Sequence, residues 1–128
     1  MNENLKDLSG VRVLVVEDEF AVLLLVEDML TELGCEVAGT ASRLADALSM
    51  ASRLECDAAI LDVNINGENV TPVAEALTAR DMPIVFSTGY GRSGIDARFR
   101  ERPVLQKPYR IEEFAAALRT ALAGKTGS

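Results

Sequence analysis

Residues 58–62 read Ala-Ala-Ile-Leu-Asp, an apolar run that closes on an ionisable side chain. A run this short and this apolar is typical of a strand that is buried on both faces of a parallel sheet. A carboxylate at the end of such a strand is costly unless it is paired, hydrogen-bonded or bound to a metal. Asp62 is therefore the first candidate for a functional residue.

Three other apolar runs are also followed by polar side chains with useful chemistry. In chain order these side chains are Glu17 and Asp18 after residues 13–16, Thr88 after residues 84–86, and Lys107 after residues 104–105. The carboxyl ends of parallel strands share one edge of a sheet, and ligands bind at that edge in open α/β proteins. We therefore expect these side chains to meet Asp62 in one crevice.

Apolar periodicity and turn signals predict five strands that alternate with five helices. The expected strands cover residues 11–16, 35–40, 58–62, 82–87 and 104–106, and the expected helices cover residues 18–33, 42–54, 71–80, 95–102 and 111–123. Ser42 is expected to cap the second helix, and Gly124 to end the last. The alternation predicts a doubly wound, flavodoxin-like α/β fold with a five-stranded parallel sheet in the order 2-1-3-4-5. In that order strands 1 and 3 are neighbours, so the carboxylates after strand 1 end beside Asp62.

Length, charge and cysteine content limit the class of protein. The 128 residues predict one domain at residues 10–124, between a polar leader at 1–9 and a tail at 125–128. Acidic residues outnumber basic ones by 20 to 13, which argues against binding to nucleic acid. No run approaches the ~20 apolar residues of a membrane span, and no secretory signal is evident. Cys35 and Cys56 are expected to lie too far apart for a disulfide, as free thiols of a cytoplasmic protein.

The chain resembles the receiver domains of two-component response regulators over residues 10–124. The matching motifs are, in chain order, Val15-Val16-Glu17-Asp18-Glu19, Ile60-Leu61-Asp62, Pro83-Ile84-Val85-Phe86-Ser87-Thr88-Gly89 and Lys107-Pro108. Any one of them is commonplace, but all four stand at strand ends and in the order of the family. The resemblance implies that Asp62 accepts a phosphoryl group as a nucleophile. It also implies that Thr88 and Lys107 bind the phosphoryl oxygens.

The resemblance further implies a Mg²⁺ site. Its ligands would be the carboxylates of Glu17, Asp18 and Asp62 together with the backbone carbonyl of Asn64. Oxygen ligands of this kind suit Mg²⁺, which would offset the repulsion among three clustered carboxylates. The bond before Pro108 is expected to be cis, because the family uses this proline to aim the preceding lysine.

Two positions depart from the pattern of the family. Val104 stands where many receivers have an aromatic side chain that turns inward on phosphorylation, and Asn66 stands where many have proline. Residues 86–90 resemble instead a subfamily of stand-alone receivers with an aromatic-x-Thr-Gly-aromatic motif. We therefore assign the moving aromatic to Tyr90 as a hypothesis, since the nearby glycines leave its loop free to move. Tyr90 and the Asn64 side chain are also expected to affect the lifetime of the phosphate.

The function implied by the resemblance is that of a single-domain bacterial response regulator, a phosphorylation switch and not an enzyme with other substrates. The implied phosphoryl donor is a sensor histidine kinase, of the HWE type by the subfamily resemblance, or a phosphotransfer protein. The switched surface would contact a downstream protein, and the chain is expected to be a monomer or a weak homodimer.

Three other functions remain open at this point. The chain can act as a phosphate sink or relay intermediate, or as a degenerate receiver that serves as a constitutive interaction module. A metal-dependent phosphatase with an Asp nucleophile is a further alternative. That class has an acid–base carboxylate two residues after the nucleophile, and Asn64 occupies this position.

Overall fold

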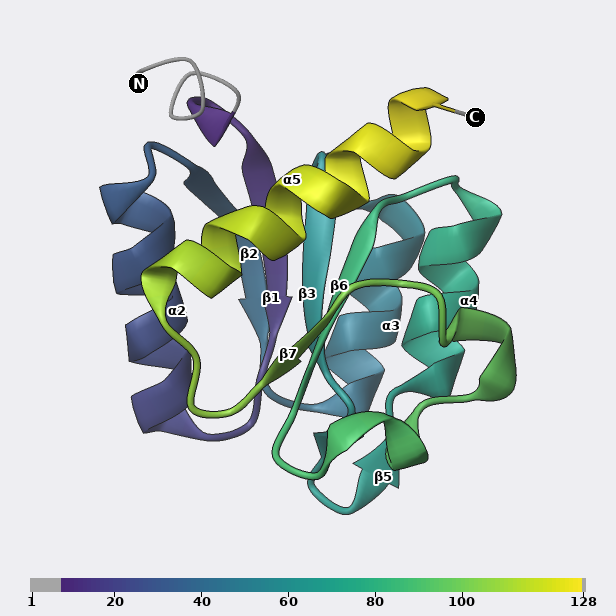
Figure 1. The fold of residues 1–128 in the computed structure, drawn as a ribbon. Coiled ribbons are helices and arrows are strands. Elements are labelled where there is room, and N and C mark those ends of the chain that lie inside the picture. The colour runs from purple at the N-terminus through teal and green to yellow at the C-terminus, as the bar shows by residue number, and fades with distance from the viewer. Residues whose placement is uncertain (1–7, 128) are drawn as a thin grey trace.

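The computed structural model describes residues 8–127, in which a parallel sheet lies between two layers of helices (Figure 1). The elements are, in chain order, β1 (Arg12–Val16), α2 (Phe20–Glu32), β2 (Glu36–Ala41), α3 (Leu44–Arg53), β3 (Ala58–Asp62), β4 (Asn64–Ile65), β5 (Glu68–Asn69), α4 (Thr71–Ala79), β6 (Ile84–Thr88), the 3₁₀ turns η1 (Gly91–Gly94) and η2 (Ala97–Phe99), β7 (Val104–Gln106) and α5 (Ile111–Gly127). β4 and β5 form a small antiparallel hairpin apart from the main sheet.

The main sheet has the order β2-β1-β3-β6-β7, and all of its strand pairs are parallel. β6 and β7 are its fourth and fifth strands in chain order, so the predicted order 2-1-3-4-5 is confirmed. β3 lies between β1 and β6, with Val16 opposite Leu61 and Asp62 opposite Ser87. The ends of β1, β3 and β6 therefore lie side by side, and β7, which Lys107 follows, pairs with β6.

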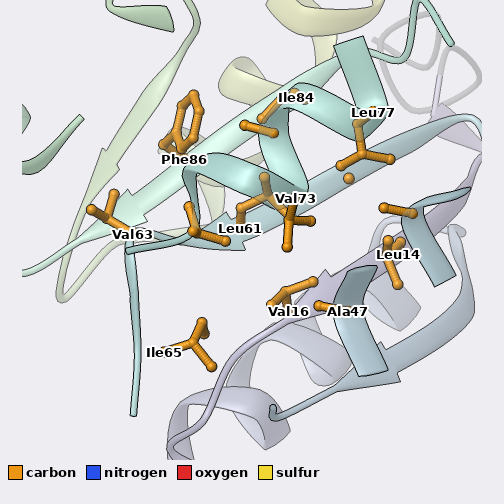
Figure 2. Close-up of a cluster of buried hydrophobic side chains, with 14 of the residues drawn as sticks. Leu14, Val16, Ala47, Leu61, Val63, Ile65, Val73, Leu77, Ile84 and Phe86 are labelled. Carbon is orange, nitrogen blue, oxygen red and sulfur yellow. The ribbon is translucent and has the colours of Figure 1, made fainter. Parts of the chain in front are cut away.

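Each face of the sheet packs against its own pair of helices. Leu14 and Val16 of β1 belong to a buried cluster that also contains side chains of α3 and α4, part of which Figure 2 shows. Val13 and Val15 belong to the second cluster, with side chains of α2 and α5. Because alternate residues of one strand enter different clusters, β1 is apolar at all four positions from Val13 to Val16, as a strand buried on both faces requires.

The described residues contain four α-helices, so the prediction of five helices is wrong. The segment predicted as a helix at 95–102 forms only the short 3₁₀ turn η2, and the other turn, η1, lies just before it. Only Ile95 and Phe99 are buried in it, which leaves no apolar stripe for a helix to pack on the core. Arginine side chains bind the backbone carbonyls: Arg92 Nη1 donates to the Arg100 carbonyl at 2.7 Å, and Arg100 Nε to the Ile95 carbonyl at 3.0 Å.

Two predicted helix ends are also wrong. Ser42 does not cap α3, because this helix begins one residue later, after Arg43, and has no side-chain capping bond. Gly124 does not end α5, which continues to Gly127 and so includes most of the predicted tail. A glycine inside a helix costs only about 1 kcal/mol, so it is a weak stop signal on its own. Even with this extension, no helix among residues 8–127 is long and apolar enough to cross a bilayer.

Leu8 departs from the predicted polar leader at residues 1–9. Its side chain is fully buried in the cluster that contains side chains of α2 and α5. Its carbonyl accepts a hydrogen bond from the Cys35 thiol at 3.3 Å, which ties the start of the described chain to the start of β2. Residues 1–7, the rest of the predicted leader, lie outside the described residues. Cys35 and Cys56 are both free thiols, as predicted.

Candidate functional site

Asp62 ends β3 at the centre of the sheet, and only 6% of the residue is exposed. Its Oδ1 accepts the Asn64 N–H at 3.1 Å, and its Oδ2 accepts a hydrogen bond from Lys107 Nζ at 2.8 Å. A buried carboxylate needs such partners, and the ammonium supplies a charge-assisted bond. The sequence prediction that Asp62 meets Lys107 at this edge is confirmed.

Lys107 directly follows β7 and reaches across two strands to the acidic side chains. Its Nζ lies 3.3 Å from Glu17 Oε1 and 3.4 Å from Glu19 Oε1, in addition to its bond with Asp62. Burial opposes the positive charge, but Asp62 and then Glu17 outweigh it, so the pKa of Lys107 is raised above its ordinary value. The bond between Lys107 and Pro108 is cis, as predicted.

Glu17 and Asp18 follow β1 and lie beside Asp62. Each of the three residues offers one carboxylate oxygen, and these oxygens lie within 4.8 Å of one another. Burial, and then a hydrogen bond with Asp62, raise the pKa of Glu17 from 4.5 to about 7. A set of three carboxylates this close fits one divalent ion with oxygen ligands, such as Mg²⁺.

Thr88 ends β6 on the other side of Asp62 and is 4% exposed. Its Oγ1 accepts the Tyr90 N–H at 3.0 Å, and its carbonyl accepts the Lys107 N–H at 2.8 Å. The hydroxyl hydrogen of Thr88 is thus left to donate into the site. The residues that line the open pocket at this edge include Asp18, Glu19, Asp62, Asn64, Asn69, Thr88, Tyr90, Gly94 and Lys107.

The roles predicted for Asn64 and Tyr90 stay predictions. Asn64 lines the pocket, and its Oδ1 accepts the Gly67 N–H at 2.9 Å, which holds its side chain in the hairpin. Tyr90 also lines the pocket but is 90% exposed, so its ring lies outside the core in this structure.

The hairpin formed by β4 and β5 is the part of the site that sequence analysis missed. Its two-residue turn is Asn66-Gly67, with φ of 54° and 85°, the left-handed conformation that a type I′ turn requires. Asn66 N–H donates to Asp18 Oδ2 at 2.8 Å, and Asn66 Nδ2 donates to the Ser42 carbonyl at 3.0 Å. The Asn-Gly pair at 66–67 was a signal for this hairpin, which the five predicted strands do not include. The hairpin therefore fixes the position of the Asp18 carboxylate through the backbone N–H of Asn66.

We expect Asn66→Pro to lower the free energy of unfolding by about 2 kcal/mol or more, as measured by urea denaturation. Proline cannot adopt the positive φ of Asn66 and has no N–H to donate to Asp18. The control is Asn66→Gly, which keeps both the N–H and the backbone conformation and should change stability much less. Equal losses in the two variants would show that the backbone amide and the turn conformation are not what matters here.

The fold and the site together define a doubly wound α/β protein with an acidic pocket that is also lined by a lysine. The family model of the response regulator receiver domain matches residues 13–119. The chain therefore belongs to the response regulator receiver domain family of two-component systems, as the sequence motifs predicted.

Several solved structures are similar to the chain. SdrG from Sphingomonas melonis Fr1, solved in solution, is 47% identical with a TM-score of 0.79, and the match covers 90% of this chain and 97% of that one. A BeF3-activated conformation of SdrG, from Pseudomonas melonis Fr1, is 46% identical with a TM-score of 0.75 over 89% of this chain and 98% of that one. The response regulator PhyR from Brucella abortus shares the fold, with 21% identity and a TM-score of 0.83 over 98% of this chain and 53% of PhyR.

Among curated proteins, the transcriptional regulatory protein PdtaR of Mycobacterium tuberculosis is 29% identical over 115 residues, which are 87% of this chain. The chain spans about half the length of such relatives, at 56% of PdtaR and 51% of the transcriptional regulatory protein PrrA of Mycobacterium leprae. The similarity therefore concerns their receiver portion.

Proposed function

We propose that this receiver accepts a phosphoryl group on Asp62 from the phosphohistidine of a sensor histidine kinase or a phosphotransfer protein. The observation that carries the proposal is the position of Asp62, 2.8 Å from Lys107 Nζ and within 4.8 Å of the carboxylates of Glu17 and Asp18. The phosphohistidine lies outside these 128 residues, because they contain no histidine.

In the proposed transfer, an Asp62 carboxylate oxygen forms the new O–P bond while the N–P bond of the donor breaks and its electron pair stays on the imidazole. Lys107, which now binds Asp62, would pair with the phosphoryl oxygens and balance their charge. The hydroxyl of Thr88 would donate to one of these oxygens, since its acceptor side is occupied by the Tyr90 N–H.

Glu17, Asp18 and Asp62, with the Asn64 carbonyl as a further proposed ligand, would hold Mg²⁺. The ion supplies positive charge where an anionic phosphoryl group must approach an anionic carboxylate. Without it, Lys107 is the one cation in the described part of the chain that pairs with the buried carboxylates of Glu17 and Asp62.

The proposed output is a change in the surface built from η1, η2, β7 and α5, read by a downstream protein. Tyr90 is our candidate for the moving aromatic, because the position used by many receivers holds Val104. The proposed change in this surface is supported by the similarity to SdrG, for which a BeF3-activated conformation has been solved. The resemblance of residues 86–90 to the stand-alone receiver subfamily supports a kinase of the HWE type as the donor.

The test is incubation with acetyl phosphate and Mg²⁺, followed by intact-mass measurement. We expect a labile adduct of ~80 Da on the wild-type chain and none on Asp62→Asn. Absence of the adduct from the wild type would favour a degenerate receiver that acts as a constitutive interaction module. Turnover of a generic phosphate ester would favour the phosphatase alternative.

The fate of the phosphoryl group distinguishes a relay intermediate, a phosphate sink and a switch. Phosphate that passes on to a second histidine protein would identify a relay intermediate, and phosphate that is lost to water without a change in partner binding would identify a phosphate sink. Partner binding that depends on the adduct would support the switch.

A further inference from the structure

The walls of the pocket around Asp62 come largely from two loops that are far apart in the sequence. One follows β3 and contains the hairpin of β4 and β5, and the other follows β6 and contains η1. The two loops are tied at one point, where Asn69 Nδ2 donates to the Gly94 carbonyl at 2.9 Å. Both residues line the pocket, so the hydrogen bond joins two parts of its wall.

The orientation of the Asn69 amide is fixed by its other end. Its Oδ1 accepts hydrogen bonds from both the backbone N–H and the hydroxyl of Thr71, the first residue of α4. An amide whose oxygen faces two donors must present its NH₂ on the opposite side, toward Gly94. Asn69 therefore connects the start of α4 to η1.

Gly94 allows the two loops to approach closely. A Cβ at this position would lie 3.1 Å from Val63 Cγ1, which is tighter than ordinary van der Waals contact. The next residue, Ile95, is buried in the core cluster that also contains Val63. The other end of the same loop is held by the bond from Tyr90 N–H to Thr88 Oγ1. Movement of the loop would thus reach Thr88, which lines the same pocket as Asp62.

We propose that Asn69 is a positioning residue, whose amide ties the η1 loop to the hairpin and thereby sets how far the phosphoacceptor pocket is closed to water. The role in phosphate chemistry rests on the proposed function of Asp62. Loss of the tie opens the pocket wall and speeds hydrolysis of the phosphorylated chain.

Two substitutions remove the tie and keep a hydrogen bond to Thr71 at the start of α4. Asn69→Asp retains both bonds accepted from Thr71 but places an oxygen against the Gly94 carbonyl. Asn69→Ser also accepts from the Thr71 N–H, as serine does in turns of this kind, and is too short to reach Gly94. Only Asn69→Asp adds a charge, so an effect that both variants share is due to loss of the hydrogen bond to the Gly94 carbonyl. Thr71→Val is the matched control, since it removes one bond to Asn69 and leaves the tie intact.

The first measurement is amide hydrogen exchange of the unphosphorylated chain. We expect the Ile95 amide, which bonds to the Arg92 carbonyl, to exchange about 3- to 10-fold faster in both Asn69 variants, with β1 and β3 unchanged. The second measurement is decay of the ~80 Da adduct in Mg²⁺, expected to be several-fold faster in the same two variants. Thr71→Val should match the wild type in both.

Wild-type exchange at Ile95 in the Asn69 variants would overturn the proposal. So would faster exchange with unchanged decay of the adduct, or an effect confined to Asn69→Asp. A wild-type chain that forms no adduct would overturn the proposed function and the role in closing the pocket, while the exchange comparison would still decide whether Asn69 holds the loop.

Discussion

Replacement of Lys107 by methionine is expected to lower the free energy of unfolding of the metal-free protein by about 3 kcal/mol at pH 8. Lys107 Nζ is 2.8 Å from Asp62 and 3.3 Å from Glu17, and both carboxylate side chains are less than a tenth exposed. The substitution keeps most of the side-chain volume but leaves two buried carboxylates without a cation. The cost of such unpaired charges, more than the loss of attraction itself, produces the effect.

Urea denaturation at pH 8 measures this loss, and Arg98→Met is the control. Arg98 makes a contact of similar length with Glu75, at 2.7 Å, but its side chain is 57% exposed. Water already solvates that pair, so the control variant should lose little. Equal losses in the two variants would contradict the account of Lys107.

The same account predicts how the loss depends on the acidic partners. Adding Asp62→Asn to Lys107→Met should restore part of the stability, because one of the unpaired charges is gone. At pH 5 the loss should also shrink, since buried carboxylates without a cation take up protons more readily. A double variant no more stable than Lys107→Met alone would show that the two side chains are not coupled.

The sequence predicted the composition of the site because strand ends are the most regular feature of this fold. Asp62, Thr88 and Lys107 each follow a short apolar run, and in a parallel sheet all such runs end at one edge. The strand order then determines which of these side chains are neighbours along the edge. The alternation of strands and helices predicted that order.

The parts that sequence analysis missed depend on side chains that bind backbone groups. The segment 95–102 contains enough apolar residues for a weak helix prediction, but Arg92 and Arg100 bind its carbonyls, and only the 3₁₀ turn η2 forms within it. The exposed side chain of Asn69 reaches a carbonyl 25 residues away. Periodicity describes which residues are buried and says nothing of such contacts.

Glu17→Gln is expected to stabilise the metal-free protein at pH 8, by up to about 3 kcal/mol. The pKa of Glu17 in the folded protein is about 7, above the ordinary value of 4.5 that applies to the unfolded chain. A raised carboxyl pKa means that the folded state binds the proton more tightly. Its stabilising contribution is complete below about pH 4.5 and is lost as the pH rises through about 7.

Wild-type stability should therefore fall across this pH range, and the glutamine variant should fall less, because glutamine carries no charge at either pH. Thermal unfolding at pH 5 and pH 8 measures both curves, with Glu32→Gln, an exposed carboxylate on α2, as the control. Mg²⁺ in the proposed site would bind only the folded chain, and its addition should raise wild-type stability at pH 8 more than that of Glu17→Gln. A glutamine variant less stable than wild type at pH 8 without Mg²⁺ would show that Lys107 already compensates the Glu17 charge in full, and that the cluster has no excess negative charge for a metal to offset.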